Sequence, residues 1–189
     1  MAISKEYREQ LTKLHSKVDS FGKRSKLPNE FKNLLDDNKF DSILDFGAGK
    51  GNVTNTLIVD YPDTKIYSYD PVTYNVPLPT EVDVVYSSDV LEHIEPELLD
   101  DTLSELFDRA RKYQYHLIAC HPAKKKLSNG KNAHLIIEEP EWWKQKLEKF
   151  DNWSIVYEDT QEWIATPKKG PPLPIKKYIV ILKKENNQS

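Results

Sequence analysis

The stretch ILDFGAGKGN, residues 43–52, constrains the fold of this chain more than any other part of it. Two apolar residues lead into Asp45, and three glycines then occupy alternate positions within residues 47–51. Residues 52–60 continue with a helical pattern, so the stretch predicts a strand, a tight turn and the start of a helix. Glycine is needed where the backbone takes positive φ or touches a ligand without a Cβ atom. Such a turn offers bare N–H groups and the positive end of a helix dipole to a ligand.

The remaining chain alternates short apolar runs with stretches whose apolar residues recur three and four apart, which predicts strands and helices in alternation. This order indicates an α/β protein, a layered sheet with helices on both faces. A chain of 189 residues fits one domain, 1–189. Within it we distinguish an N-terminal helical extension (1–40), a half with the glycine turn (41–120) and a final half (121–189). The expected strands are residues 42–46, 65–69, 82–87, 115–120, 153–158 and 178–182, and the expected helices are residues 4–20, 29–38, 52–60, 96–112 and 139–150.

Charge and composition exclude several classes of protein. The formal net charge is −3, and the segment 41–120 carries 15 acidic and 5 basic residues. This charge does not indicate nucleic-acid binding, although nucleic acid stays possible as a partner. The single cysteine, Cys120, excludes an internal disulfide and a cysteine-cluster metal site. No apolar run is long enough to span a bilayer, and the first residues lack the apolar core of a signal peptide. We therefore expect a cytoplasmic protein without a membrane partner.

Two well-known phosphate-binding patterns fit the glycine turn poorly. A P-loop requires Ser or Thr after its Gly-Lys pair, whereas Gly51 follows Lys50 here. A dinucleotide-binding turn places its third glycine three residues after the second, and that position is Asn52. The turn is therefore expected to hold another kind of ligand.

The acid before the glycines gives a better match. Asp45-Phe46-Gly47-Ala48-Gly49-Lys50-Gly51 resembles the first motif of class I S-adenosylmethionine-dependent methyltransferases, in which the turn wraps the methionine part of the cofactor. Asp70 ends the second expected strand, and by resemblance its carboxylate accepts hydrogen bonds from the ribose hydroxyls. The segment 83–96 resembles the next strand of the family and the loop that lies beside the cofactor. The cofactor-binding residues that the resemblance implies are Asp45, Phe46, Gly47, Ala48, Gly49, Gly51, Asp70, Pro71, Ser88, Asp89 and Val90.

The resemblance implies a Rossmann-like methyltransferase fold, with a mostly parallel sheet, helices on both faces and additional N-terminal helices. It covers residues 41–120, which makes this segment the cofactor-binding half of a single methyltransferase domain and leaves the substrate side to the rest. The family places a helix and another strand after the ribose-binding acid, and residues 71–81 are too few for both. We therefore expect one edge of the sheet to be trimmed. Pro71, Val72 and Tyr74 become the candidates for contact with adenine.

Methyl transfer from a sulfonium is an in-line displacement, which requires alignment of donor and acceptor and in some cases a base. The candidate catalytic residues are His93, His121 and His134, because they follow strands whose carboxyl ends bear the ligands of such sheets, and histidine titrates near neutral pH. Each of them could equally have a polar or capping role. Glu92 is either an active group or a solvated acid at the start of a helix. The sequence predicts no metal site.

Two features on the substrate side have open interpretations. The polar loop 124–134 could bind an anionic or polyhydroxyl substrate, or its lysines could only solvate it. Trp163 could line the mouth of a substrate site, whereas packing is the commoner role of a tryptophan.

The sequence thus favours a methyltransferase with S-adenosylmethionine as cofactor and an unidentified acceptor, a small molecule in preference to nucleic acid. The layout is similar to that of small stand-alone methyltransferases from bacteria and their phages. One alternative is a non-catalytic descendant of the fold that binds a cofactor or a partner. Another is an enzyme that uses NAD or a nucleotide sugar on the same fold.

Overall fold

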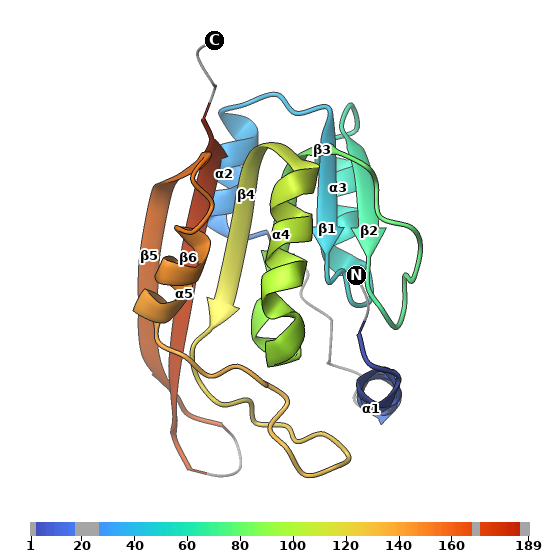
Figure 1. The fold of residues 1–189 in the computed structure, drawn as a ribbon, viewed down its shortest axis with the longest axis vertical. Helices are drawn as coiled ribbons and strands as arrows, with labels where there is room; N and C mark the ends of the chain where they lie inside the picture. The colour runs from blue at the N-terminus through green and yellow to red at the C-terminus, as the bar shows by residue number, and fades with distance from the viewer. Residues whose placement is uncertain (1–2, 18–26, 168–170, 186–189) are drawn as a thin grey trace.

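The computed structural model describes residues 3–17, 27–167 and 171–185, which form a sheet with helices packed against it (Figure 1). The strands of this six-stranded sheet follow the order β2-β1-β3-β4-β6-β5. The helices are α1 (Lys5–Lys17), α2 (Asn29–Asp36), α3 (Asn52–Asp60), η1 (Leu91–His93), η2 (Pro96–Leu98), α4 (Leu99–Arg109) and α5 (Pro140–Leu147), and the strands are β1 (Ser42–Phe46), β2 (Lys65–Tyr69), β3 (Val82–Ser88), β4 (Ala110–Ala119), β5 (Trp153–Ala165) and β6 (Leu173–Lys184).

The sheet is mostly parallel, as the sequence predicts. Strands β2, β1, β3 and β4 run parallel to one another, whereas β6 is antiparallel to both β4 and β5. The chain passes from β1 outward to β2 and then returns to β3 on the other side of β1, so the strand order reverses beside β1. In open sheets of this kind, ligands bind at the carboxyl ends of the strands where the order reverses.

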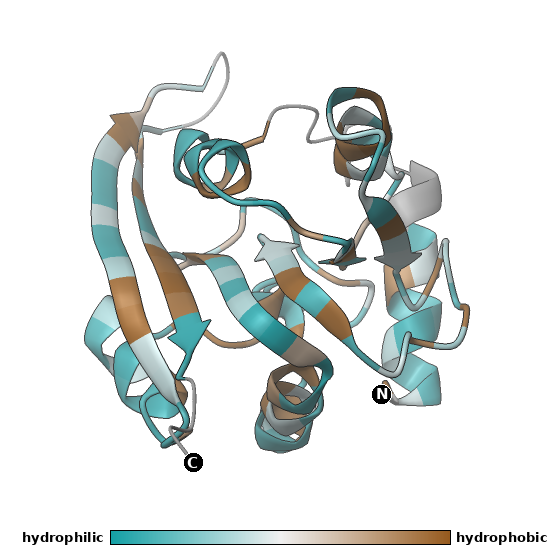
Figure 2. Cartoon of the chain, turned by 90° about the horizontal axis from the view of Figure 1, so that it is seen from above, coloured by the Kyte–Doolittle hydropathy of each residue, from teal (hydrophilic) through white to brown (hydrophobic). Residues whose placement is uncertain are grey.

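Helices cover both faces of the sheet because successive strand residues point to opposite sides. On one face, Leu44 and Phe46 of β1 share a buried apolar cluster with Leu103 of α4 and Trp143 of α5. On the other face, Ile43 joins a cluster that includes apolar residues of α2 and α3. Seen from above, helices lie on two sides of the sheet, with apolar segments along the strands between them (Figure 2).

The trimmed edge that the sequence predicts is present. Strand β2 lies at the edge of the sheet, and residues 71–81 form no further strand or helix beyond an isolated bridge between Asp70 and Tyr74. The N-terminal helices are also present. Helix α2 packs on the sheet through Phe31 and Leu35, whereas α1 is described only to Lys17, so the rest of the expected helix 4–20 lies outside the described residues.

The predicted end of the helix over 96–112 is wrong. Helix α4 ends at Arg109 and β4 begins at the next residue, without a connecting loop. Arg111 and Lys112, which fall inside the predicted helix, lie on β4 instead. They form ion pairs of 2.8 and 3.0 Å with the buried carboxylate of Asp83 on the neighbouring strand β3. Pairing with β3 therefore replaces the last turn of the expected helix.

The last two strands are longer than the sequence predicts. Their pairing runs from Trp153 opposite Lys184 to Ala165 opposite Leu173, so the segment expected to link the strands is itself mostly strand. Strand β5 forms an edge of the sheet and has only half-buried and exposed residues. Because neither of its faces is fully covered, its sequence lacks the apolar alternation that marks a half-buried strand. Within the described ranges, no helix is long and apolar enough to cross a membrane.

The glycine turn has the conformation that its sequence predicts. Gly47, Gly49 and Gly51 have φ values of +79°, +55° and +74°, and Gly51 is the N-cap of α3. Gly47 N donates a hydrogen bond of 2.8 Å to the carbonyl of Tyr69, which ties the turn to the end of β2. A Cβ atom on Gly47 would lie 2.3 and 2.7 Å from the two Cγ atoms of Val90, so the backbone approaches too closely for any side chain.

We predict that Gly47→Ala lowers the free energy of unfolding by about 2–5 kcal/mol, from left-handed backbone strain and the clash with Val90 together. Gly130→Ala is the matched control, because Gly130 has φ +85° and a Cβ atom there meets nothing within 4 Å. It should lose only the strain, about 1–2 kcal/mol. Urea unfolding of both variants measures the difference. The double variant Gly47→Ala/Val90→Ala should recover the clash component, and equal losses in the two single variants would contradict the interpretation.

Candidate functional site

A cavity of about 580 Å³ opens at the carboxyl ends of β1, β2, β3 and β4, at the position where the strand order reverses. Its volume lies in the usual range for small-molecule sites. Nearly every residue that the sequence singled out borders it, although these residues come from segments far apart in the chain. The sequence-predicted residues that line the cavity are Asp45, Phe46, Gly47, Ala48, Gly49, Asp70, Pro71, Ser88, Asp89, Val90, His93, His121 and His134.

Five sequence-predicted candidates lie outside the cavity lining: Gly51, Val72, Tyr74, Glu92 and Trp163. Gly51 faces the hydroxyl of Tyr74, which a Cβ atom on the glycine would approach to 2.5 Å, so both residues pack beside the turn and neither borders the cavity. Trp163 lies on β5 opposite Ile175 and is 44% exposed. Ile175 borders the cavity, whereas Trp163 does not.

Asp70 links the glycine turn to the loop after β2 through hydrogen bonds. Its Oδ1 accepts hydrogen bonds from the backbone N–H groups of Val72 and Thr73, at 2.9 and 3.0 Å. Its Oδ2 accepts from Gly49 N at 3.2 Å. Thr73 in turn donates from its hydroxyl to the carbonyl of Gly49. The carboxylate is thus fixed at the cavity wall with its oxygens directed by backbone donors.

Asp45 is a buried acid beneath the turn. It is 2% exposed, and its Oδ2 accepts a hydrogen bond of 2.6 Å from the Thr54 hydroxyl on α3. Burial raises the pKa of Asp45 to about 6, although the hydrogen bonds from Thr54 act in the opposite direction. A carboxyl group with this pKa changes its protonation close to neutral pH.

Asp89 has a strained backbone at the end of β3. Its φ of +56° is the only positive value at a non-glycine position among the described residues. Asp89 N donates to the carbonyl of Leu117 on β4, at 2.8 Å, and its Oδ1 forms an ion pair of 2.6 Å with Lys177 Nζ on β6. Strain of this kind persists where the surroundings determine the conformation, and it is concentrated at functional sites. Lys177 also lines the cavity, and the sequence gave no periodicity or motif that indicated it.

The three histidines lie together in the cavity lining, after the ends of β3 and β4. The ring centroid of His134 is 4.9 Å from that of His93 and 5.4 Å from that of His121. Each ring donates from Nδ1 to a backbone carbonyl: His93 to Ala133, His134 to His121 and His121 to Lys176, at 2.6, 2.5 and 2.8 Å. Burial lowers the pKa of His134, which favours its neutral form. The structure thus brings together three candidates that are up to 41 positions apart in the sequence.

Glu92 is buried, which overturns its interpretation as a solvated acid. Its side chain is 0% exposed and lies under the histidines, with His134 Nε2 4.0 Å from its Oε1. Burial and the neighbouring Asp89 raise the pKa of Glu92 well above the ordinary range of a carboxylic acid. The helical pattern of the residues after Glu92 did not indicate that its side chain is buried. The burial comes from the loop after β4, which covers η1.

Helix α1 and Ile3 before it add an apolar wall to the cavity. Ile3, Tyr7 and Leu11 line the cavity, and the Tyr7 hydroxyl donates a hydrogen bond of 2.5 Å to the carbonyl of His93. Tyr7 and Leu11 also pack against Leu127 of the loop after β4. The buried side of α1 therefore covers the cavity and the loop after β4.

No protein-family model and no curated protein sequence matches the chain. Its fold does match the folds of solved structures. A Haemonchus contortus phosphoethanolamine N-methyltransferase, in complex with phosphomonomethylethanolamine and S-adenosylhomocysteine, has a TM-score of 0.65 at 11% identity, over 98% of this chain and 61% of the other.

Two further structures match over nearly the whole of both chains. A proposed methyltransferase of Haloferax volcanii, in complex with the Trm112 methyltransferase activator, has a TM-score of 0.63 at 11% identity and covers 97% and 99% of the two chains. The 1,6-didemethyltoxoflavin N1-methyltransferase of Burkholderia thailandensis, with its substrate and S-adenosylhomocysteine bound, has a TM-score of 0.58 at 15% identity and covers 98% and 92%. The chain therefore has the Rossmann-like fold of the class I methyltransferases.

Proposed function

We propose that this protein transfers a methyl group from S-adenosylmethionine to a small-molecule acceptor. The observation that carries the proposal is the single cavity wall formed by the glycine turn, Asp70 and residues 88–90. These are the three elements that the sequence resemblance assigns to cofactor binding, and they meet at the carboxyl ends of three adjacent strands. The methyltransferase fold of the chain supports the same conclusion.

The residues present fit the cofactor. The glycines have positive φ values, and Gly47 and Gly49 border the cavity with bare backbone. Asp70 offers carboxylate oxygens for ribose hydroxyls. The apolar wall of Tyr7 and Leu11 on α1, together with Pro71, is our candidate for the adenine side in place of the missing strand. When bound, the cofactor supplies an electrophilic methyl group on a sulfonium sulfur.

The histidine side of the cavity is our candidate for acceptor binding. His93, His121 and His134 border the same cavity as the glycine turn, so an acceptor held beside them would lie close to the donor. A neutral imidazole can accept a proton from the attacking group as it is methylated. Small acceptors are favoured because two of the similar structures contain small substrates, phosphomonomethylethanolamine and 1,6-didemethyltoxoflavin.

The proposal is tested first by binding and transfer. Calorimetry should detect S-adenosylmethionine and S-adenosylhomocysteine binding, with NAD as the control ligand. Radiolabelled S-adenosylmethionine, incubated with the protein and separate extract fractions of small molecules, RNA and protein, should label the small-molecule fraction. Absence of binding at millimolar ligand would refute the enzyme. Binding without label in any fraction would favour a non-catalytic relative of the fold, and label in RNA would overturn the acceptor class.

We predict that Asp70→Ala weakens S-adenosylhomocysteine binding by roughly 1.5–3 kcal/mol, the range for loss of a charged hydrogen-bond partner. Asp63→Ala is the matched control, since Asp63 is exposed and precedes β2 at the opposite end of that strand. Calorimetry measures both affinities. Because Asp70 also accepts backbone hydrogen bonds, circular dichroism and thermal unfolding establish that each variant is folded at the assay temperature. Unchanged affinity in folded Asp70→Ala would place the ribose elsewhere.

A further inference from the structure

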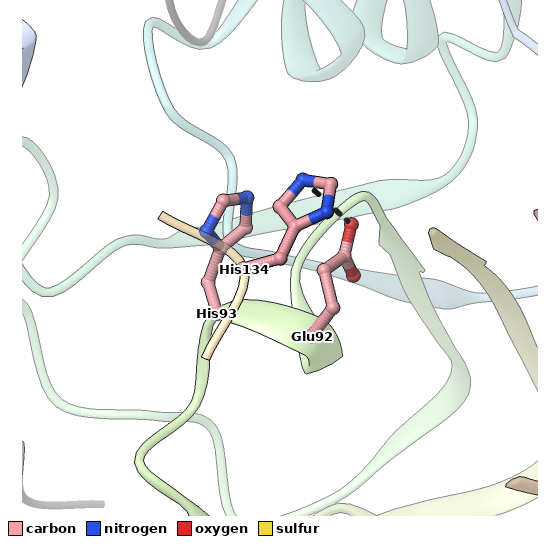
Figure 3. A group of neighbouring side chains, drawn as sticks. All are labelled: Glu92, His93 and His134. Carbon is pink, nitrogen blue, oxygen red and sulfur yellow. Dashed lines mark ion pairs between the residues drawn. The ribbon is translucent and has the colours of Figure 1, made fainter. Parts of the chain in front are cut away.

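One cluster of side chains in the cavity wall has the composition of a metal site. Glu92, His93 and His134 each offer a ligand atom, and these atoms all lie within 4.8 Å of one another. Glu92 and His93 are adjacent on η1 after β3, whereas His134 comes from the loop after β4. Their side chains turn toward one another in Figure 3. Two strand ends and the loop that covers them thus build one group.

Both histidine rings are oriented as metal ligands are. His93 Nδ1 donates to the carbonyl of Ala133 and His134 Nδ1 to that of His121, at 2.6 and 2.5 Å. A neutral imidazole that donates from Nδ1 carries its lone pair on Nε2. Histidines that bind metals usually donate their other ring N–H to a carbonyl or carboxylate, which fixes the ring and its tautomer. The loop backbone already provides this outer support.

Glu92 gives an independent indication of a bound cation. Its side chain is fully buried, and among the residues that the structure describes no other side chain donates a hydrogen bond to either carboxylate oxygen. A buried carboxylate without such partners is costly, so it is protonated or compensated by a positive charge. His134 Nε2 lies 4.0 Å from Oε1, so an ion between the two atoms would contact both.

We infer that Glu92, His93 and His134 bind one divalent first-row transition-metal ion. Two imidazoles and one carboxylate form the ligand set of many catalytic zinc sites, in which a further position stays open to water or substrate. His93 and His134 line the cavity, so the open position faces it. Metal bonds of about 2.1 Å place tetrahedral ligand atoms about 3.4 Å apart, so the side chains must close by about an ångström on binding.

The charges around the cluster permit a cation. Asp89 and Lys177 are the neighbouring charged groups, and they form an ion pair of 2.6 Å with each other. This pair is neutral as a whole, so the carboxylate of Glu92 leaves the surroundings with one negative charge. A divalent ion therefore meets no net repulsion, and it would compensate the buried carboxylate.

The test is a titration of the untagged full-length protein, first freed of metal with a chelator, with Zn²⁺ and Co²⁺. Calorimetry with Zn²⁺ should give one ion per chain, and Co²⁺ should develop the visible absorption of a low-symmetry site with nitrogen ligands. Glu92→Gln and His134→Asn should each weaken Zn²⁺ binding by at least the roughly 100-fold that loss of an outer-shell partner can reach. Glu139→Gln is the matched control, because Glu139 is an exposed acid that pairs with Lys176, and it should bind like the wild type.

Circular dichroism of each variant, and the thermal unfolding of the metal-free forms, separate loss of a ligand from loss of fold. The inference is overturned if no ion binds at millimolar Zn²⁺, or if folded Glu92→Gln and His134→Asn bind with wild-type affinity. The titration needs neither methyl donor nor acceptor. Its failure would therefore leave the proposed methyl transfer standing, and failure of cofactor binding would leave the metal site standing.

Discussion

The close approach of the turn after β1 to the segment after β3 is the contact on which the site depends. Gly47 leaves no room for a Cβ atom beside Val90, and the same turn is tied to the end of β2 through the Tyr69 carbonyl and Asp70. These contacts hold three strand ends at fixed positions. The bare backbone at Gly47 lets the turn lie against Val90, and both residues border the cavity.

The strand order brings the ends of four strands to one cavity. Because the order reverses beside β1, the segments after β1, β2, β3 and β4 all border it. The segments after β1 and β2 contribute backbone donors and the acid Asp70. Those after β3 and β4 contribute the histidines, the buried Glu92 and Asp89, which pairs with Lys177. The proposed donor and acceptor sites, and the proposed metal site, follow from this arrangement.

The sequence pattern was sufficient for three elements around the glycine turn. The strands at 42–46 and 65–69 and the helix at 52–60 occur with the predicted bounds. Prediction failed where tertiary pairing extends an element beyond its local pattern. Arg111 and Lys112 lie on β4, where both form ion pairs with Asp83. Strand β5 pairs with β6 along its length, although neither face of β5 is fully covered. Neither effect is visible within a window of sequence.

The sequence by itself determined the glycine turn, the acid at Asp70, the mostly parallel sheet and its missing edge strand, since each depends on backbone geometry or on chain length between neighbouring elements. Only the tertiary structure decided which groups after β3 and β4 come together at the cavity. Glu92 is buried because the loop after β4 folds over η1, and that loop brings His134 to His93 from 41 positions away. Burial and proximity of this kind arise from long-range packing, which no spacing along the chain encodes.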